Sequence, residues 1–151
     1  MQTILIIHNL LRWLVLLFGV WAVMNAIAGL SSKKEYVVAD KKGGFFFMLS
    51  MDIQLIIGLI LYFVGPWFNN LKHLGEIMKD PNTRFFTMEH GLMMIIAWIF
   101  VHVGVSAVKK ATLSRVKFKR ALIYFGIALV LILASIPWPF REAIARPLFR
   151  Y

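Results

Sequence analysis

The chain has 151 residues, 60% of them hydrophobic, and its mean hydropathy is +0.76. A soluble domain of this length would be roughly half apolar, so the composition predicts a single-domain protein that uses lipid as its solvent. The formal net charge is +10, but the basic residues stand between long apolar runs, where they meet phospholipid headgroups, so we expect a lipid bilayer and no nucleic acid as partner. The chain contains no cysteine, which excludes disulfides, thiolate metal sites, iron–sulfur clusters and covalent c-type haem attachment.

Four apolar runs predict four membrane-spanning helices, at residues 4–30, 45–64, 85–108 and 118–136. A hydrocarbon core of about 30 Å takes roughly 20 helical residues, so each run is long enough to cross it. We read the first run as a retained span and not as a cleaved signal peptide, because no basic residue precedes Arg12 and the run is too long. The expected fold is all-α, an integral membrane up-and-down four-helix bundle that forms one transmembrane domain over residues 1–151.

Turn and cap residues bound the apolar runs. Gly43-Gly44 precedes the second run and Gly65-Pro66 ends it, while Pro137 stops the fourth. Asp80-Pro81 is typical of a helix start, with an N-cap followed by proline in the first turn. In the connection, residues 67–78 carry apolar side chains at three- and four-residue steps, which predicts a short helix on the outer membrane face.

Basic residues in the short loops predict the orientation. Residues 31–44 and 109–120 carry ten Lys and Arg, whereas residues 65–84 and the C-terminal tail, which includes Arg150, carry six. This asymmetry predicts that both termini lie on the outer side, and we expect a multi-pass protein of a bacterial inner membrane.

Ionisable side chains inside spans are expensive, so they face the bundle interior or mark a function. Depths taken from the helix rise predict two layers. The outer layer holds His8, Arg12, Glu89 and His90, and the inner layer holds Asp52 and His102 with Gln54 as a polar companion.

The outer layer suggests a haem site. His8 and His90 belong to different helices at matching depth, and four-helix bundles place cofactor ligands on facing helices. The hypothesis is that the two imidazoles ligate the iron of one b-type haem near the outer leaflet. Arg12 would then pair with Glu89 or with a haem propionate.

Other readings of these residues stay open. Each histidine could have a purely structural role, and His8, Glu89 and His90 could hold a non-haem metal. A second haem is not expected, because His90 and His102 point about 120° apart on their helix and the second and fourth spans contain no histidine. We expect His102 to hydrogen-bond Asp52 or to line a polar site, and His73 to face solvent or headgroups.

Five segments carry a resemblance: 8–14 (HNLLRWL), 52–59 (DIQLIIGL), 84–90 (RFFTMEH), 102–104 (HVG) and 136–141 (IPWPFR). With them the chain resembles, over nearly its whole length, a family of small bacterial four-span membrane proteins often labelled cytochrome b-like. The resemblance implies the four-span fold and a haem held by two histidines, His8 with His90 or His102. The chain departs from the diheme pattern of such proteins, so the resemblance does not imply an electron relay across the membrane.

We therefore expect a membrane cytochrome that exchanges electrons with a quinol or a membrane redox partner. The alternatives are a cofactor-free accessory subunit of a respiratory or photosynthetic complex, and a proton or small-solute conduit that uses Asp52 and His102. The sequence offers no nucleophile–base pair and no phosphate loop, so an electron carrier or accessory subunit is expected in preference to an enzyme.

Overall fold

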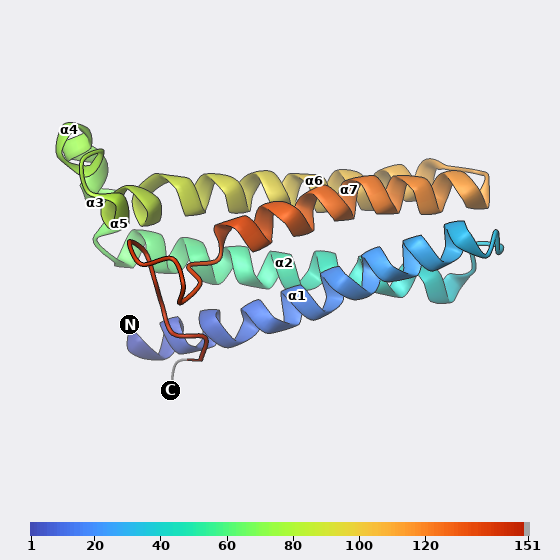
Figure 1. Cartoon of the computed structure of the whole chain (residues 1–151), viewed down its shortest axis with the longest axis horizontal. Helices are drawn as coiled ribbons and strands as arrows, with labels where there is room; N and C mark the ends of the chain where they lie inside the picture. The colour runs from blue at the N-terminus through green and yellow to red at the C-terminus, as the bar shows by residue number, and fades with distance from the viewer. Residues whose placement is uncertain (150–151) are drawn as a thin grey trace.

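The chain folds as a bundle of four long helices in a computed structural model that describes residues 1–149. They are α1 (Gln2–Ser31), α2 (Val38–Val64), α6 (His90–Lys110) and α7 (Ser114–Ser135) (Figure 1). Two pieces precede α6 directly, α5 (Pro81–Arg84) and a π-helical turn (Phe85–Glu89), which makes one continuous rod of residues 81–110. All four rods are long and apolar enough to cross a membrane.

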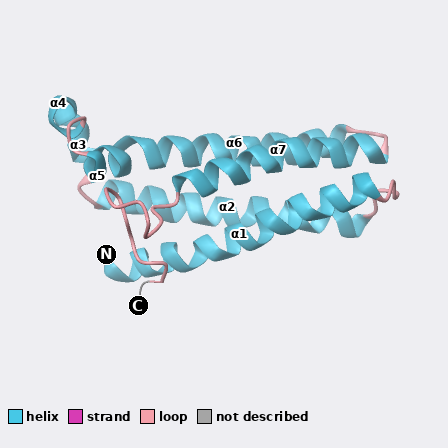
Figure 2. Ribbon diagram, in the orientation of Figure 1, coloured by secondary structure: helices cyan, strands magenta, loops and turns pink. Residues whose placement is uncertain are grey.

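The helices run alternately up and down, in the order α1, α2, α6 and α7 around the bundle. Helix α1 packs on α2 and α7, and α6 packs on α7 and α2, so α1 and α6 lie on one diagonal. The N-terminus and the C-terminal tail lie at the same end, which we call the terminal end (Figures 1 and 2). After α7 the tail folds back over this end toward the start of α1. Arg150, counted among the outer basic residues, lies outside the described residues.

The apolar runs begin later than the helices that contain them, because hydropathy marks only the apolar part of a helix. Helix α2 begins at Val38, seven residues before its predicted start, and its first turns contain Asp40 and two lysines. Gly43 and Gly44 are therefore inside α2 and are not a turn. A Cβ on Gly43 would lie 3.2 Å from the Cα of Ala22, so the glycine lets α1 and α2 approach closely.

Residues 67–78 do not form the single short helix that we predicted. It consists of α3 (Trp67–Asn70), a 3₁₀ turn (Leu71–His73) and α4 (Leu74–Ile77). The backbone leaves helical geometry at His73, whose φ is −123° and ψ is 44°, so the rod breaks there.

The predicted helix start at residues 80–81 is confirmed. The Asp80 carboxylate accepts a hydrogen bond from the backbone N–H of Thr83 at 2.8 Å, and Pro81 occupies the first turn. Hydrogen bonds from the Thr83 hydroxyl and then from its backbone N–H hold the pKa of Asp80 below its ordinary value.

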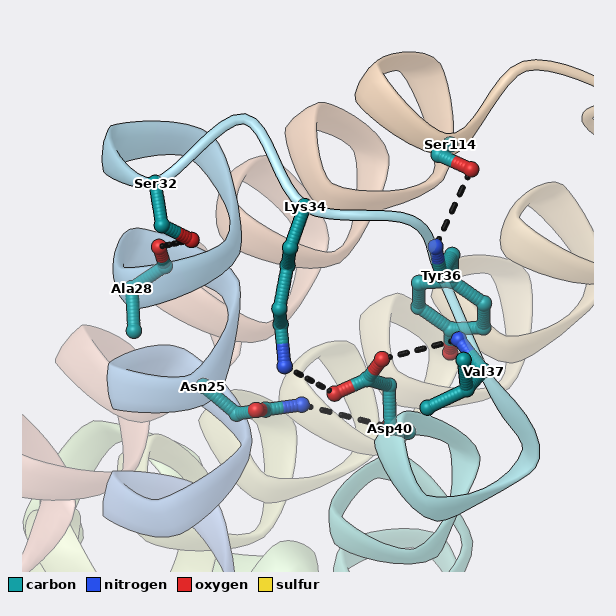
Figure 3. A network of polar contacts seen from close by, with 8 residues as sticks. All are labelled: Asn25, Ala28, Ser32, Lys34, Tyr36, Val37, Asp40 and Ser114. Carbon is teal, nitrogen blue, oxygen red and sulfur yellow. Dashed lines mark hydrogen bonds and ion pairs between the residues drawn. The ribbon is translucent and has the colours of Figure 1, made fainter.

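A polar network fastens the end of the bundle opposite the termini (Figure 3). Lys34 Nζ lies 2.7 Å from one carboxylate oxygen of Asp40, and the other oxygen accepts the backbone N–H of Val37 at 2.9 Å. The backbone N–H of Tyr36 donates to the Ser114 hydroxyl at 3.0 Å, which ties the α1–α2 loop to α7. These bonds satisfy donors that the helix starts would otherwise leave open.

Close packing of α6 on α7 requires a glycine at position 104. A Cβ there would lie 2.7 Å from the Cβ of Tyr124 and 2.9 Å from the ring of Phe125, and a Cβ cannot rotate away. We expect Gly104→Ala to destabilise the bundle by about 1–3 kcal/mol through overpacking. Gly126→Ala in α7 is the matched control, because no atom lies within 4 Å of a Cβ there.

The control removes a helical glycine at no steric cost, so it should be neutral or stabilising by up to about 1 kcal/mol. Thermal unfolding of both variants in detergent, followed by circular dichroism, measures the difference. Equal midpoints for the two variants would contradict this account of the α6–α7 contact.

Candidate functional site

Two histidines from diagonal helices meet inside the terminal end of the bundle. His8 lies in the second turn of α1 and His90 is the first residue of α6. Their ring centroids are 6.3 Å apart and the ring planes are inclined by 74°. The sequence placed both residues in one layer, and the fold brings their rings together.

The π-helical turn before α6 sets the position of His90. The backbone N–H of His90 bonds to the carbonyl of Phe85, five residues back, where an α-helix would use the fourth. His90 Nδ1 lies 2.9 Å from the carbonyl oxygen of Ser135 at the end of α7. A carbonyl only accepts, so Nδ1 carries the proton and Nε2 keeps its lone pair. His90 is thus oriented as a metal-ligating histidine is, with its second nitrogen held by a carbonyl.

His8 is held between α1 and α2. A Cβ on Gly58 would lie 3.3 Å from Cε1 of His8, so only glycine leaves the ring its full space. His8 Nδ1 is buried and has no hydrogen-bond partner among the described residues. Buried polar atoms are nearly always paired, so this nitrogen marks a place where a ligand can bind.

Both histidines line a cavity of about 360 Å³ bounded by α1, α2, the π-helical turn, α6, the end of α7 and the tail. Its wall is mostly apolar and includes residues of α2 from Met51 to Tyr62, then Pro66 and Trp67 of the following connection. The part of the wall formed by α2 therefore extends over about 16 Å of helix rise. Its volume is in the range of small-molecule and cofactor sites, about 300–1,000 Å³.

Arg12 lies in the wall of this cavity, and Glu89, one of the two partners predicted for it, was wrong. Its Nη2 donates to the backbone carbonyl of Leu148 in the tail at 2.6 Å, while its Nε is buried without a partner among residues 1–149. Glu89 instead accepts a hydrogen bond from Nε of Arg84 at 2.6 Å. Adjacent helical residues point about 100° apart, so while His90 faces the cavity, Glu89 turns to its near neighbour Arg84.

The prediction that Gln54 belongs to the inner layer is wrong, because Gln54 lies in the outer site. Its amide nitrogen donates to the carbonyl of His8 at 2.9 Å, and its amide oxygen is buried without a described partner. The early start of α2 moves the middle of that helix to residue 51, so Gln54 lies about 4.5 Å toward the terminal end.

The predicted contact between Asp52 and His102 is confirmed. His102 Nε2 lies 3.2 Å from Asp52 Oδ1, and Nε1 of Trp98 donates to the same oxygen at 2.7 Å. Trp98 was missed, although its position four residues before His102 on one helix face was a usable signal. His73 is exposed, as expected.

The outer site can hold a metal through two imidazoles only. Within residues 1–149 no three His, Asp or Glu side chains are grouped closely enough to hold an ion, and the alternative set of His8, Glu89 and His90 is broken by the turn of Glu89 to Arg84. A porphyrin supplies four nitrogen ligands itself, so haem iron needs only two axial groups. Two imidazoles bound at about 2 Å on opposite sides of one metal have ring centroids roughly 6 Å apart. The observed spacing fits this requirement.

Two groups that complete the site are backbone carbonyls, those of Ser135 and Leu148. No residue type indicates which backbone carbonyl will accept a hydrogen bond, so the sequence contained no signal for these two groups.

Comparisons of the chain with protein-family models, with curated proteins and with solved structures found no match.

The contact between Arg12 and the tail is open to a direct test. Trp13 also donates to the Leu148 carbonyl at 3.3 Å, but a hydrogen bond from a charged group contributes more, about 1.5–3 kcal/mol. We expect Arg12→Met to release the tail and to speed tryptic cleavage after Arg141 by about ten-fold or more. Mass spectrometry of the detergent-solubilised protein measures the cleavage rate. Arg115→Met, at the opposite end, is the control, and an unchanged rate in Arg12→Met would contradict the contact.

Proposed function

We propose that this chain is a membrane-bound, b-type cytochrome-like electron-transfer protein that holds one haem between His8 and His90. The observation that carries the proposal is the approach of these two imidazoles, from diagonal helices, at 6.3 Å in the wall of a mostly apolar cavity. Small bacterial four-span proteins labelled cytochrome b-like, which the sequence resembles, would share this arrangement.

The residues around the cavity suit a haem in several ways. His90 offers Nε2 as a ligand because its Nδ1–H is bound to the Ser135 carbonyl, which also raises the basicity of the ring. The apolar wall keeps water away from the iron, and burial of this kind is one of the protein's means of setting a redox potential. Arg12 and Arg146 line the same cavity and would pair with the two propionates.

When bound, haem iron accepts and releases one electron. The histidines lie at one end of the bundle, so electrons are exchanged at that side of the membrane, with a quinol or a membrane redox partner. The excess of basic residues at the opposite end favours an orientation with both termini and the haem on the outer side. The proposal is therefore a protein of a bacterial inner membrane that exchanges electrons at the outer leaflet.

The absorption spectrum of the purified protein tests the proposal. We expect a Soret band and sharp α and β bands on reduction, because two axial imidazoles hold the iron in one fixed environment. His8→Ala and His90→Ala should each lose these bands. His102→Ala and His73→Ala are the matched controls and should keep them, since neither residue lines the cavity.

A colourless wild-type protein from haem-replete cells would overturn the proposal. So would bands that survive in both His8→Ala and His90→Ala. Far-ultraviolet circular dichroism of all four variants separates loss of haem from loss of fold.

Filling the cavity provides a test that leaves both histidines in place. Gly91 lines the cavity, and no atom lies within 4 Å of a Cβ at this position. A leucine at this position would enter the space that the haem needs, so we expect Gly91→Leu to reduce the haem content at least ten-fold while the helix content stays the same. Gly126→Leu on α7 is the control, because its surroundings are equally open and it does not line the cavity. Equal haem content in both variants would contradict the assignment of this cavity.

A further inference from the structure

The two histidines of the outer site are held to different degrees. His90 is fixed by its backbone N–H, which bonds to the carbonyl of Phe85, and by its ring, whose Nδ1 lies 2.9 Å from the Ser135 carbonyl. The rings of Phe85 and Phe86 also contact it, with centroids 5.8 and 6.3 Å from that of His90. The orientation of His90 is therefore set before any metal binds.

The ring of His8 makes no hydrogen bond to any residue between 1 and 149. Its Nδ1 is buried and unpaired beside Gly58, where a Cβ would lie 3.9 Å away. Although this unpaired nitrogen marks the site, it has no free surface, so Nε2 is the nitrogen that a metal in the cavity would reach. Nδ1 would then keep a proton that no described group accepts. Loss of such a hydrogen-bond partner typically weakens metal binding by about 10–100-fold.

The backbone that carries each histidine differs in the same direction. The first buried residue of α1 is Arg12, so the turns that carry His8 contain no buried residue. The π-helical turn before His90 instead buries Phe85 and Thr87, which are 1% and 2% exposed. Gln54 does donate to the carbonyl of His8 at 2.9 Å, but this bond holds the backbone and leaves the ring free to turn. His8 is thus the more weakly held of the two ligands.

The cavity leaves room for a small ligand beside His8. Leu5 and Met1 precede His8 by about one and two helical turns, and both line the cavity. The open space therefore continues past His8 toward the terminal end. Because most of the wall is apolar, it favours an uncharged ligand over an anion.

We propose that His90 is the permanent axial ligand and that His8 is exchangeable, so that the reduced protein binds a small uncharged diatomic molecule, such as carbon monoxide, in place of His8. The inference rests on the proposed function, because it requires the haem. The bond from His8 Nε2 to iron breaks and a bond from the diatomic ligand to iron forms. Each bond uses an electron pair of the ligand, so the exchange transfers no electron and releases no proton.

Carbon monoxide tests the inference in the purified holoprotein. After reduction with dithionite, we expect carbon monoxide to shift the Soret band and to change the α and β bands. The rate should become independent of the carbon monoxide concentration once this is high, because the departure of His8 then limits it. A reduced wild type that shows the haem bands and does not respond to carbon monoxide overturns the inference and leaves the cytochrome proposal standing. A wild type without haem bands overturns both.

Supplying the missing hydrogen bond identifies the histidine that leaves. A Cβ at position 58 would lie 3.9 Å from Nδ1 of His8, so the hydroxyl of Gly58→Ser, one bond further out, can come within hydrogen-bond distance of Nδ1. We expect Gly58→Ser to slow carbon monoxide binding about ten-fold or more relative to Gly58→Ala. Gly58→Ala is the matched control, because it brings the same Cβ to 3.3 Å from Cε1 of His8 without a hydroxyl.

Equal rates in the two position-58 variants would show that His8 is not the ligand that leaves, and would overturn the inference. Gly126→Ser on α7 is a second control and should bind carbon monoxide at the wild-type rate, because its surroundings are open and it does not line the cavity. Rates are compared per bound haem, so a lower haem content in one variant does not affect the comparison.

Discussion

The bundle depends on how closely its helices can approach each other, and this differs between its two ends. Away from the termini, small residues bring backbones together: Gly43 lies against Ala22, and Gly104 lies against Tyr124 and Phe125. Lipid provides no hydrophobic force between helices, so close contact of this kind is what holds them together. At the terminal end a cavity lies among α1, α2 and α6, and His8 and His90 line it. The bundle thus combines close backbone contacts away from the termini with a space for a ligand at the terminal end.

Buried polar side chains in this bundle use backbone carbonyls as hydrogen-bond partners, and not only side chains of opposite charge. Arg12 uses the carbonyl of Leu148, and His90 uses the carbonyl of Ser135. Both carbonyls lie at or beyond the end of α7, where intrahelical bonds no longer use them. The last helix and the tail therefore orient two of the four residues first expected in the outer site. Glu89 is free to pair with Arg84 because the buried arginine does not need it.

The two polar layers have different surroundings, and this separates their roles. The outer layer opens into an apolar cavity with imidazoles on opposing helices, which suits a cofactor. The inner pair of Asp52 and His102 bridges α2 and α6, and each side chain is partly exposed. Leu59 and Ile95, from the same two helices, line the cavity and are 40% and 41% exposed.

The sequence by itself determined the four apolar rods, the cap at Asp80 and the common layer of His8 and His90, because hydropathy, cap chemistry and helix rise are local properties. It also identified Asp52 and His102 as partners. Only the tertiary structure decided the partner of Arg12 and the place of Gln54. Those depend on where the tail crosses α1 and on how far α2 extends before its apolar part begins. Backbone carbonyls are present at every residue, so no sequence pattern can indicate which of them a distant side chain will reach.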